Sequence, residues 1–284
     1  MREVTAFIPG LKYLSISITG SYCTLMCDFC RANYLDGMRK ALTPKEFYDL
    51  VKHLVRSGAK GVLISGGFNR DGYLPIEPYL PVIKDIKNNY DILVSVHIGL
   101  ADKSLASKLR DSKVDVVDYE LILDDYVIKN LMHLGGKSSE DFIKSYETLI
   151  NYGPSYIVPH IPIGMNYGRV VKEMEAANTA LAYKPEVLVF LIFKPTAGTP
   201  MANVRPPGDD EVLRVIRYTR DNYSGEIALG CMRPLEKKYT LDFKLIDLGL
   251  IDRIANPLKS LVSKYGLKMV ELCCSIPKDL IDRV

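Results

Sequence analysis

The sequence lacks any apolar run approaching the roughly eighteen residues that a membrane-spanning helix needs. Its first ten residues, Met1–Gly10, also lack the apolar core of a secretory signal. Excess charge is small, because the formal net charge is +3 and the basic residues are dispersed along the chain. We therefore expect a cytoplasmic protein that binds neither a membrane nor a nucleic acid.

Internal repeats, low-complexity tracts and long linkers are also lacking, so the 284 residues, 48% of them hydrophobic, are expected to form one domain over 1–284. Short β-branched runs alternate with longer amphipathic stretches, which is typical of βα units around a parallel sheet. The predicted strands are Tyr13–Thr19, Gly61–Ser65, Ile92–Ile98, Val114–Glu120, Tyr156–Ile161, Val187–Phe193, Glu226–Leu229 and a very short Arg253–Ala255. This pattern predicts an α/β fold, a TIM-type (β/α) barrel that its short last strand can leave incomplete. The barrel core is expected over 13–257, and a C-terminal extension over 258–284.

Amphipathic stretches between these strands predict the helices. The first has a clear start, with Thr43 as its N-cap, Pro44 at the first helical position and Glu46 completing a capping box. Later helices are expected at Glu77–Asn88, Asp102–Asp111, Ser139–Asn151, Val170–Tyr183 and Asp209–Asn222.

Three of the six cysteines, Cys23, Cys27 and Cys30, form a C-x3-C-x2-C triplet just after the first predicted strand. A structural zinc site needs four ligands, and the nearest histidine, His53, lies inside a predicted helix. A disulfide framework is not expected in a chain of this length without a secretory segment. Buried structural cysteines are common but rarely form such triplets. Three thiolates without a fourth partner favour an iron–sulfur cluster with one iron open to another ligand.

Several predicted strands end in polar or reactive groups, at the edge where barrels of this kind carry their chemistry. In chain order these are Ser65, Gly66, Gly67, His97, Glu120, His160, Lys194, Cys231 and Arg233. A glycine pair lets the backbone approach a ligand closely. Glu120 can also be a solvated or salt-bridged carboxylate, although we favour a functional role, and a lone histidine is more often a hydrogen-bonded structural side chain.

The cysteine triplet, with Phe29 before its last member, resembles the signature of the radical S-adenosylmethionine (SAM) superfamily. Over about 13–257 the chain is similar to the branch that contains biotin synthase and lipoyl synthase. It is most like the smaller subunit of the two-component, archaeal-type lipoyl synthases, on segments 16–30 and 230–234. The glycine pair is usually followed by a glutamate, and Phe68 departs from that pattern, as biotin synthase does.

The resemblance implies that the triplet binds a [4Fe–4S] cluster whose fourth iron chelates SAM. One electron then cleaves SAM to methionine and a 5′-deoxyadenosyl radical, which removes hydrogen from an unactivated carbon. The residues that the resemblance places around SAM are Phe29, Ser65, Gly66, Gly67, Glu120 and Lys194.

The remaining cysteines, Cys231, Cys273 and Cys274, can hold a second iron–sulfur cluster or serve as small apolar filler. Two of them follow a strand-like segment, 267–272, and adjacent strand residues point to opposite faces. Joint ligation therefore requires the strand to end before them, which Ser275 and Pro277 suggest.

Biotin synthase carries auxiliary-cluster cysteines on its strands, and Ile64, Ser95 and Val158 stand at those places here. Arg233, in contrast, falls where that enzyme has its cluster-ligating arginine. The candidate contacts for an auxiliary site or a substrate are Arg233, His97 and His160.

The resemblance implies lipoyl synthase activity, the insertion of sulfur into a protein-bound octanoyl chain. The implied partners are an octanoylated lipoyl-domain protein, a second radical SAM subunit and a reductant such as ferredoxin. Two alternatives stay open. The chain could sulfurate, rearrange or methylate another small molecule, or it could be a non-catalytic iron–sulfur subunit for electron transfer or scaffolding.

Overall fold

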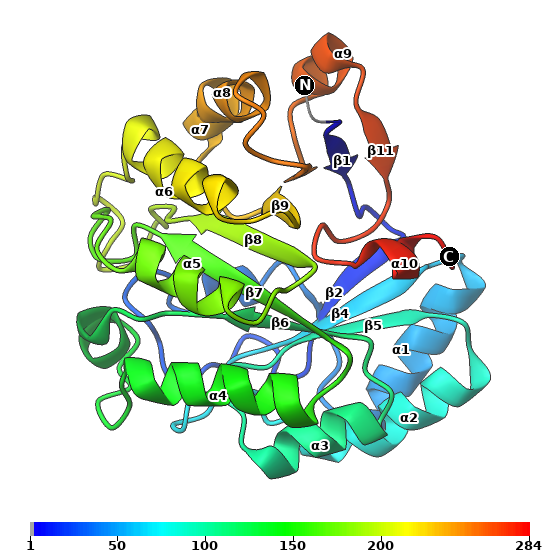
Figure 1. Ribbon diagram of the computed structural model, residues 1–284. Helices are drawn as coiled ribbons and strands as arrows, with labels where there is room; N and C mark the ends of the chain where they lie inside the picture. Colours follow the sequence, from blue (N-terminus) through cyan, green and yellow to red (C-terminus); the bar gives the residue numbers. More distant parts are fainter. Residues whose placement is uncertain (1–2) are drawn as a thin grey trace.

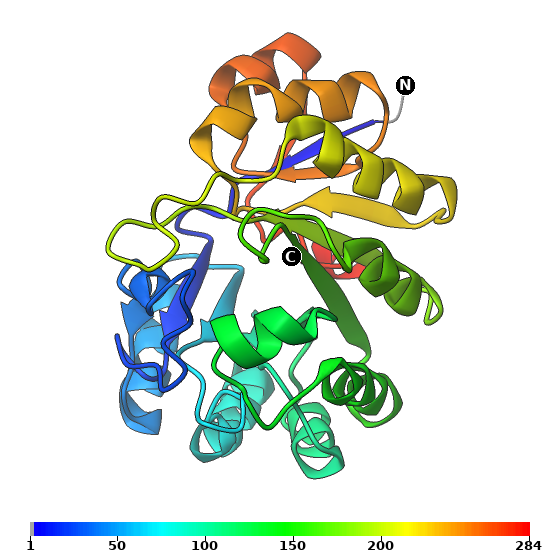
Figure 2. The same ribbon diagram turned by 90° about the vertical axis from the view of Figure 1, so that its left-hand side faces the viewer.

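The computed structural model describes residues 3–284, and its strands form one parallel, eleven-stranded sheet with the order β11-β1-β10-β9-β8-β7-β6-β5-β4-β2-β3. The sheet curls into an open barrel whose free edges are β3 and β11 (Figures 1 and 2). The strands are β1 (Thr5–Phe7), β2 (Tyr13–Ser17), β3 (Arg39–Lys40), β4 (Gly61–Ser65), β5 (Leu93–His97), β6 (Val116–Glu120), β7 (Tyr156–Ile163), β8 (Val187–Ile192), β9 (Glu226–Leu229), β10 (Arg253–Ala255) and β11 (Lys268–Val270).

Helices cover the convex side of the sheet (Figure 2). They are α1 (Pro44–Arg56), α2 (Leu80–Asn89), α3 (Lys103–Asp111), α4 (Ser139–Tyr152), α5 (Glu173–Leu181), α6 (Asp209–Asp221), α7 (Leu235–Tyr239), α8 (Leu241–Asp247), α9 (Lys259–Tyr265) and α10 (Lys278–Ile281), with the short turns η1 (Asn33–Leu35), η2 (Glu77–Tyr79) and η3 (Val127–Leu131). In the part of the chain described, none of these helices combines the length and the apolarity that crossing a membrane requires.

The start of α1 follows the sequence prediction in part. The Thr43 hydroxyl accepts a hydrogen bond from the Glu46 amide at 3.1 Å, as an N-cap should. The Glu46 carboxylate accepts from the amide of Leu42 at 2.7 Å, one residue before the cap. The reciprocal half of the predicted capping box is therefore displaced by one residue.

All eight predicted strands are present, and their ends lie within two residues of the predicted ones. β11 lies inside the strand-like segment 267–272. The sequence analysis missed β1 and β3, which have three and two residues and therefore too little alternation to recognise. The sheet extends past the expected core limits of 13–257 at both ends, because β1 pairs with both β10 and β11.

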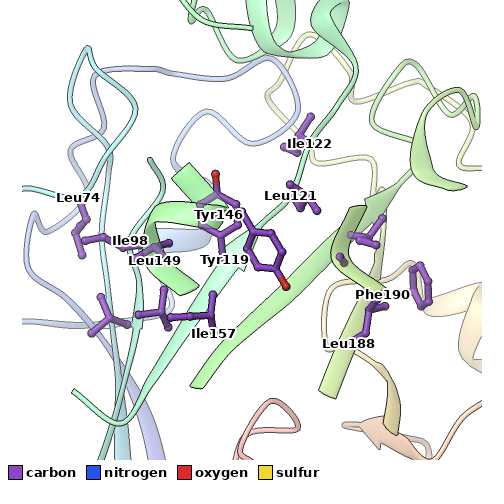
Figure 3. Packing of buried hydrophobic residues seen from close by; sticks show 14 of the residues in the cluster. Leu74, Ile98, Tyr119, Leu121, Ile122, Tyr146, Leu149, Ile157, Leu188 and Phe190 are labelled. Atoms are coloured by element: carbon purple, nitrogen blue, oxygen red, sulfur yellow. The ribbon is translucent and has the colours of Figure 1, made fainter. Parts of the chain in front are cut away.

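Alternation along β6 assigns its side chains to two faces. Tyr119 points outward, where its ring stacks on Tyr146 of α4 at 5.6 Å and its hydroxyl donates to the Phe142 carbonyl at 2.8 Å (Figure 3). Asp118 and Glu120 therefore face the concave interior of the barrel. The convex side carries the main apolar core, whereas the interior mixes apolar and polar side chains.

The chain after β11 turns back into the barrel, and we call this segment, residues 271–281, the C-terminal return. Its buried residues Leu272, Cys274, Ile276 and Leu280 pack with interior residues of the strands, among them Tyr13, Val116 and Val158. α10 lies beside the beginnings of β2 and β4 (Figure 1), and Tyr156 at the start of β7 donates to Asp279 at 2.5 Å. The predicted extension thus closes the end of the barrel at which the strands begin, which we call its lower end.

Arg253 of β10 fixes the C-terminal return. Its guanidinium is 2% exposed, donates to the carbonyls of Cys274 at 2.9 Å and Ile276 at 2.5 Å, and pairs with Glu226. Its cationic group also lies 5.1 Å from the ring centre of Phe7. We expect Arg253→Ala to destabilise the protein by about 3 kcal/mol, because two buried carbonyls lose their donor.

A urea unfolding midpoint measures this effect. Arg283→Ala is the matched control, since Arg283 is 64% exposed, pairs with Asp279 and lies just beyond the C-terminal return. An exposed pair of this kind contributes less than about 1 kcal/mol. Equal shifts for the two variants would contradict the role assigned to Arg253.

Candidate iron–sulfur and substrate site

The loop that follows β2, residues 19–32, carries the cysteine triplet and is bonded to the end of β4; we call it the cysteine loop. The Gly67 amide donates to the Thr19 hydroxyl at 2.6 Å, and the Thr24 amide donates to the Phe68 carbonyl at 2.9 Å. These bonds hold the loop against the glycine pair at the carboxyl edge of the sheet.

Gly67 is required by a close approach of two backbones. A Cβ atom at this position would lie 2.0 Å from the Tyr22 carbonyl oxygen and 2.4 Å from the Cys23 Cα atom. No side chain fits there unless the cysteine loop moves. The glycine at the end of β4 therefore shapes the cradle that holds the triplet.

The three thiols of the triplet stand together at this edge. Cys27 is buried, whereas Cys23 and Cys30 are half-buried. The hydrogen bond between Cys27 and Cys30 raises the pKa of Cys27 and lowers the pKa of Cys30. Within residues 3–284, no three His, Cys, Asp or Glu side chains form a group that could hold a metal ion. Three thiolates are the donor set that iron–sulfur clusters use, so the residue types and the cradle fit such a group.

Two other segments brace the cysteine loop. The Asp28 amide donates to the Leu131 carbonyl of η3 at 2.8 Å, and His133 Nδ1 lies 2.7 Å from the Leu25 carbonyl. His133 Nε2 also lies 3.3 Å from the Asp28 carboxylate. The sequence analysis missed His133, which lies more than a hundred residues from the loop in no recognisable motif.

Tyr34 is a second missed residue, and it joins the chain after the cysteine loop to the chain after β8. Its hydroxyl lies 3.0 Å from that of Thr196. Lys194, predicted to contact SAM, is exposed and lies two residues after the end of β8. Phe29 is half-buried and packs against the convex-side core.

His97 and Glu120 form an ion pair on the interior side of β5 and β6. His97 Nε2 and Glu120 Oε2 are 3.7 Å apart, beyond hydrogen-bond distance, and both side chains are 26% exposed. The Ser65 hydroxyl lies 3.5 Å from His97 Nδ1. Burial alone lowers the pKa of His97, but the Glu120 carboxylate outweighs burial and the net pKa is raised. Burial raises the pKa of Glu120, and His97 reverses that effect, so its net pKa is lowered.

His160 and Asp118 lie next to this pair. His160 Nε2 is 4.0 Å from Asp118 Oδ1, and its Nδ1 is 3.0 Å from the Val158 carbonyl. Asp118 is 5% exposed. Parallel register explains the grouping, because Glu120 lies opposite His160 and His97 lies opposite Asp118 on neighbouring strands. The sequence predicted a role for three of these four side chains and placed Asp118 at the end of the same strand as Glu120 without giving it a role.

Of the second set of cysteines, Cys273 and Cys274 lie on the C-terminal return, half-buried and buried respectively, whereas Cys231 is exposed after β9. β11 ends at Val270, as joint ligation by Cys273 and Cys274 requires. The hydrogen bond between these two thiols lowers the pKa of Cys273 and raises that of Cys274. Burial and then the charge of Cys273 raise the pKa of Cys231, after β9. The C-terminal return is what brings residues so distant in sequence together.

Arg233 has a different environment from the one its sequence position suggested. It is 3% exposed, and its guanidinium forms a bidentate pair with Asp242 at 2.9 and 2.7 Å. It also donates to the Gly230 carbonyl at 2.6 Å. These contacts engage all three of its nitrogens within the protein. They argue against a contact between Arg233 and a cluster or substrate. They indicate instead that Arg233 holds the chain after β9 in place.

We expect Gly67→Ala to abolish iron incorporation, because the added methyl group collides with the backbone of the cysteine loop. Iron content and visible absorbance after anaerobic reconstitution measure the effect. Gly37→Ala is the control, since a Cβ there meets nothing within 4 Å. A Gly67→Ala protein with full iron content would show that the close approach is dispensable.

His97 should titrate above the ordinary value of about 6.5, and Glu120→Gln should lower its pKa below that value, since burial then acts alone. Nuclear magnetic resonance of the four histidine rings measures both values. Glu175→Gln, with a side chain 56% exposed on α5, should leave the His97 pKa unchanged.

The same pair predicts a stability window. The pKa of His97 is raised on folding, so its contribution is complete below about 6.5 and is lost as pH rises through the raised value. The pKa of Glu120 is lowered, so its contribution is present above about 4.3 and is lost as pH falls through the lowered value. Urea midpoints of wild type and Glu120→Gln should therefore differ most between about pH 4.3 and 6.5. A difference that is constant with pH would contradict this assignment.

Comparison with known proteins identifies the family to which this chain is similar. The family model described as the radical SAM superfamily matches residues 17–177, more than half of the chain. The chain is 32% identical over 129 residues to a "Probable GTP 3′,8-cyclase" of Methanococcus aeolicus, a match that covers 43% of this chain and 41% of that protein. The chain thus spans about two fifths of the length of this curated relative.

Solved structures share the fold at low sequence identity. Methylornithine synthase (PylB) is 16% identical with a TM-score of 0.63, over 94% of this chain and 84% of that one. The hydrogenase maturase HydG from Carboxydothermus hydrogenoformans is 16% identical with a TM-score of 0.66, over 98% and 70%. Streptococcus suis SuiB bound to SAM is 18% identical with a TM-score of 0.60, over 81% and 52%. The match, from the last residue of β2 to within α5, shows that this chain belongs to the radical SAM superfamily, whose cofactors are a [4Fe–4S] cluster and SAM.

Proposed function

We propose that this protein is a radical SAM enzyme that inserts sulfur into an unactivated carbon, and that its substrate is a protein-bound octanoyl chain. The observation that supports this proposal is the presence of two sets of three free cysteines on one barrel. One group stands on the cysteine loop at the carboxyl edge, and the other lies on the C-terminal return and after β9.

In this proposal Cys23, Cys27 and Cys30 hold the [4Fe–4S] cluster, which with bound SAM supplies a 5′-deoxyadenosyl radical. The backbone of 65–67 borders the methionine part of SAM, since it follows β4 directly and lies against the cysteine loop. Glu120 accepts hydrogen bonds from the ribose hydroxyls, and His97 keeps its carboxylate ionised and oriented. Phe29 and Lys194 line the cofactor from the loops after β2 and β8.

Cys231, Cys273 and Cys274 are the proposed ligands of a second iron–sulfur group that serves as the sulfur source. The C-terminal return closes the lower end of the barrel and keeps water from the reacting carbon. The resemblance noted in the sequence supplies the proposed partners. These are an octanoylated lipoyl-domain protein as substrate, a second radical SAM subunit and a ferredoxin-like reductant, all in the cytoplasm.

A second candidate function is the cyclisation or rearrangement of a small nitrogen-containing molecule, such as GTP. The 129-residue similarity to the probable GTP 3′,8-cyclase favours it. Under this alternative the second cysteine group is apolar filler rather than a ligand set. Iron content separates the two candidates: about eight iron atoms per chain are expected for two four-iron clusters, and about four for one.

An anaerobic assay of the reconstituted protein tests both candidates. The protein is incubated with SAM, a reductant and either an octanoylated lipoyl-domain peptide or GTP, and the products are identified by mass spectrometry. We expect sulfurated octanoyl peptide and 5′-deoxyadenosine. Cyclised GTP without sulfurated peptide would instead support the second candidate.

Cysteine variants separate the two groups. Cys27→Ser should abolish 5′-deoxyadenosine formation, because the triplet loses a ligand. The double variant Cys231→Ser with Cys273→Ser should still form 5′-deoxyadenosine but yield no sulfurated product. The two variants control for one another, because each leaves the other group intact. Sulfur insertion by the double variant would remove the second group from the mechanism.

A further inference from the structure

Asp118 and His160 present two hydrogen-bond acceptors to the barrel interior without a donor between them. His160 Nδ1 lies 3.0 Å from the Val158 carbonyl, so Nδ1 carries a proton and, in the tautomer with this single proton, Nε2 is an acceptor. Nε2 lies 4.0 Å from Asp118 Oδ1, too far for a direct hydrogen bond. Asp118 is 5% exposed, and its Oδ1 is buried without any hydrogen-bond partner.

The described residues provide no lysine or arginine in an ion pair with Asp118. The two arginines near the second cysteine group are engaged elsewhere: Arg233 pairs with Asp242, and Arg253 pairs with Glu226. A buried carboxylate oxygen without a partner is costly, so such atoms are rare in native structures unless a ligand satisfies them.

The position of Asp118 separates it from the proposed cofactor contacts. Along β6 it precedes Glu120 by two residues on the same face, so it lies one step deeper into the barrel. In register it lies opposite His97 and Val158, and Ser95, whose hydroxyl accepts from Tyr13 at 2.8 Å, lies one step deeper still. A group bound here therefore lies below the ribose that Glu120 is proposed to hold, on the side of the second cysteine group.

We infer that Asp118 and His160 form a substrate subsite. It binds an N–H group of the substrate, which donates to Asp118 Oδ1 and His160 Nε2. A single nitrogen donor placed between two acceptors 4.0 Å apart can satisfy both. This inference rests on the proposed function for the choice of substrates. The amide that joins an octanoyl chain to lysine and the amino group of guanine are the two sources of such a donor.

Equilibrium binding to the reconstituted protein, measured by calorimetry without reductant, tests the subsite. The probes form two matched pairs: N-octanoyl-lysine peptide with its ester analogue, and GTP with inosine triphosphate, which lacks the amino group. In one pair we expect the N–H-bearing member to bind about 10- to 100-fold more tightly, as for a hydrogen bond to a charged acceptor. The pair that discriminates identifies the source.

Asp118→Leu should reduce this preference to less than about twofold, whereas Asp118→Asn, which keeps one acceptor oxygen, should retain part of it. Asp111→Asn, with a side chain 65% exposed on the convex side, is the control and should change nothing. Asp118→Leu should also keep or raise the urea midpoint, because it removes an unpartnered buried charge. A purely structural aspartate would destabilise the protein when replaced.

Equal binding within both pairs, no binding of any probe, or a preference that survives Asp118→Leu would overturn the subsite. The proposed reaction can be disproved independently of the subsite. Sulfurated product without N–H preference removes only the subsite, whereas N–H preference without sulfurated product removes only sulfur insertion.

Discussion

The contact between two backbones at Gly67 is the constraint on which the arrangement of the site depends. The end of β4 and the cysteine loop approach so closely that even a methyl group would collide with Tyr22 and Cys23. Hydrogen bonds from the Gly67 and Thr24 amides then fix the position of the cysteine loop along the end of β4. The triplet therefore takes its position from the sheet rather than from its own loop, and a short flexible loop becomes a defined cradle.

The parallel register of the strands also determines how the polar side chains of the interior are arranged. Because neighbouring strands are aligned residue by residue, the inward-facing positions of β5, β6 and β7 bring His97, Asp118, Glu120 and His160 into one polar wall. The opposite wall, on β8 and β9, offers Val189, Leu191 and Ala228. One half of the interior is therefore polar and the other half apolar. The C-terminal return closes the lower end, which leaves the carboxyl edge as the entrance.

The sequence predicted those features that rest on local pattern. Alternation over five or more residues marked the long strands, and the spacing of Cys23, Cys27 and Cys30 marked the metal-binding loop. β1 was missed because three residues carry too little pattern, and its place between β10 and β11 depends on pairing across the whole chain. The path of the C-terminal return could not be predicted for the same reason. The sequence placed Arg233 at the correct edge, but only the structure shows that Asp242 occupies its guanidinium.

Hydrogen-bond satisfaction provides an independent argument for where the chemistry lies. Across residues 3–284, the buried side-chain nitrogen and oxygen atoms without a partner are His97 Nε2 and Asp118 Oδ1. They stand on neighbouring strands, opposite each other in register. Folding alone would not concentrate unsatisfied atoms at one place, since each costs free energy that a better-paired residue would avoid. Both atoms lie in the polar wall beneath the cysteine loop, and the proposed subsite accounts for one of them, because a donor bound there satisfies Asp118 Oδ1.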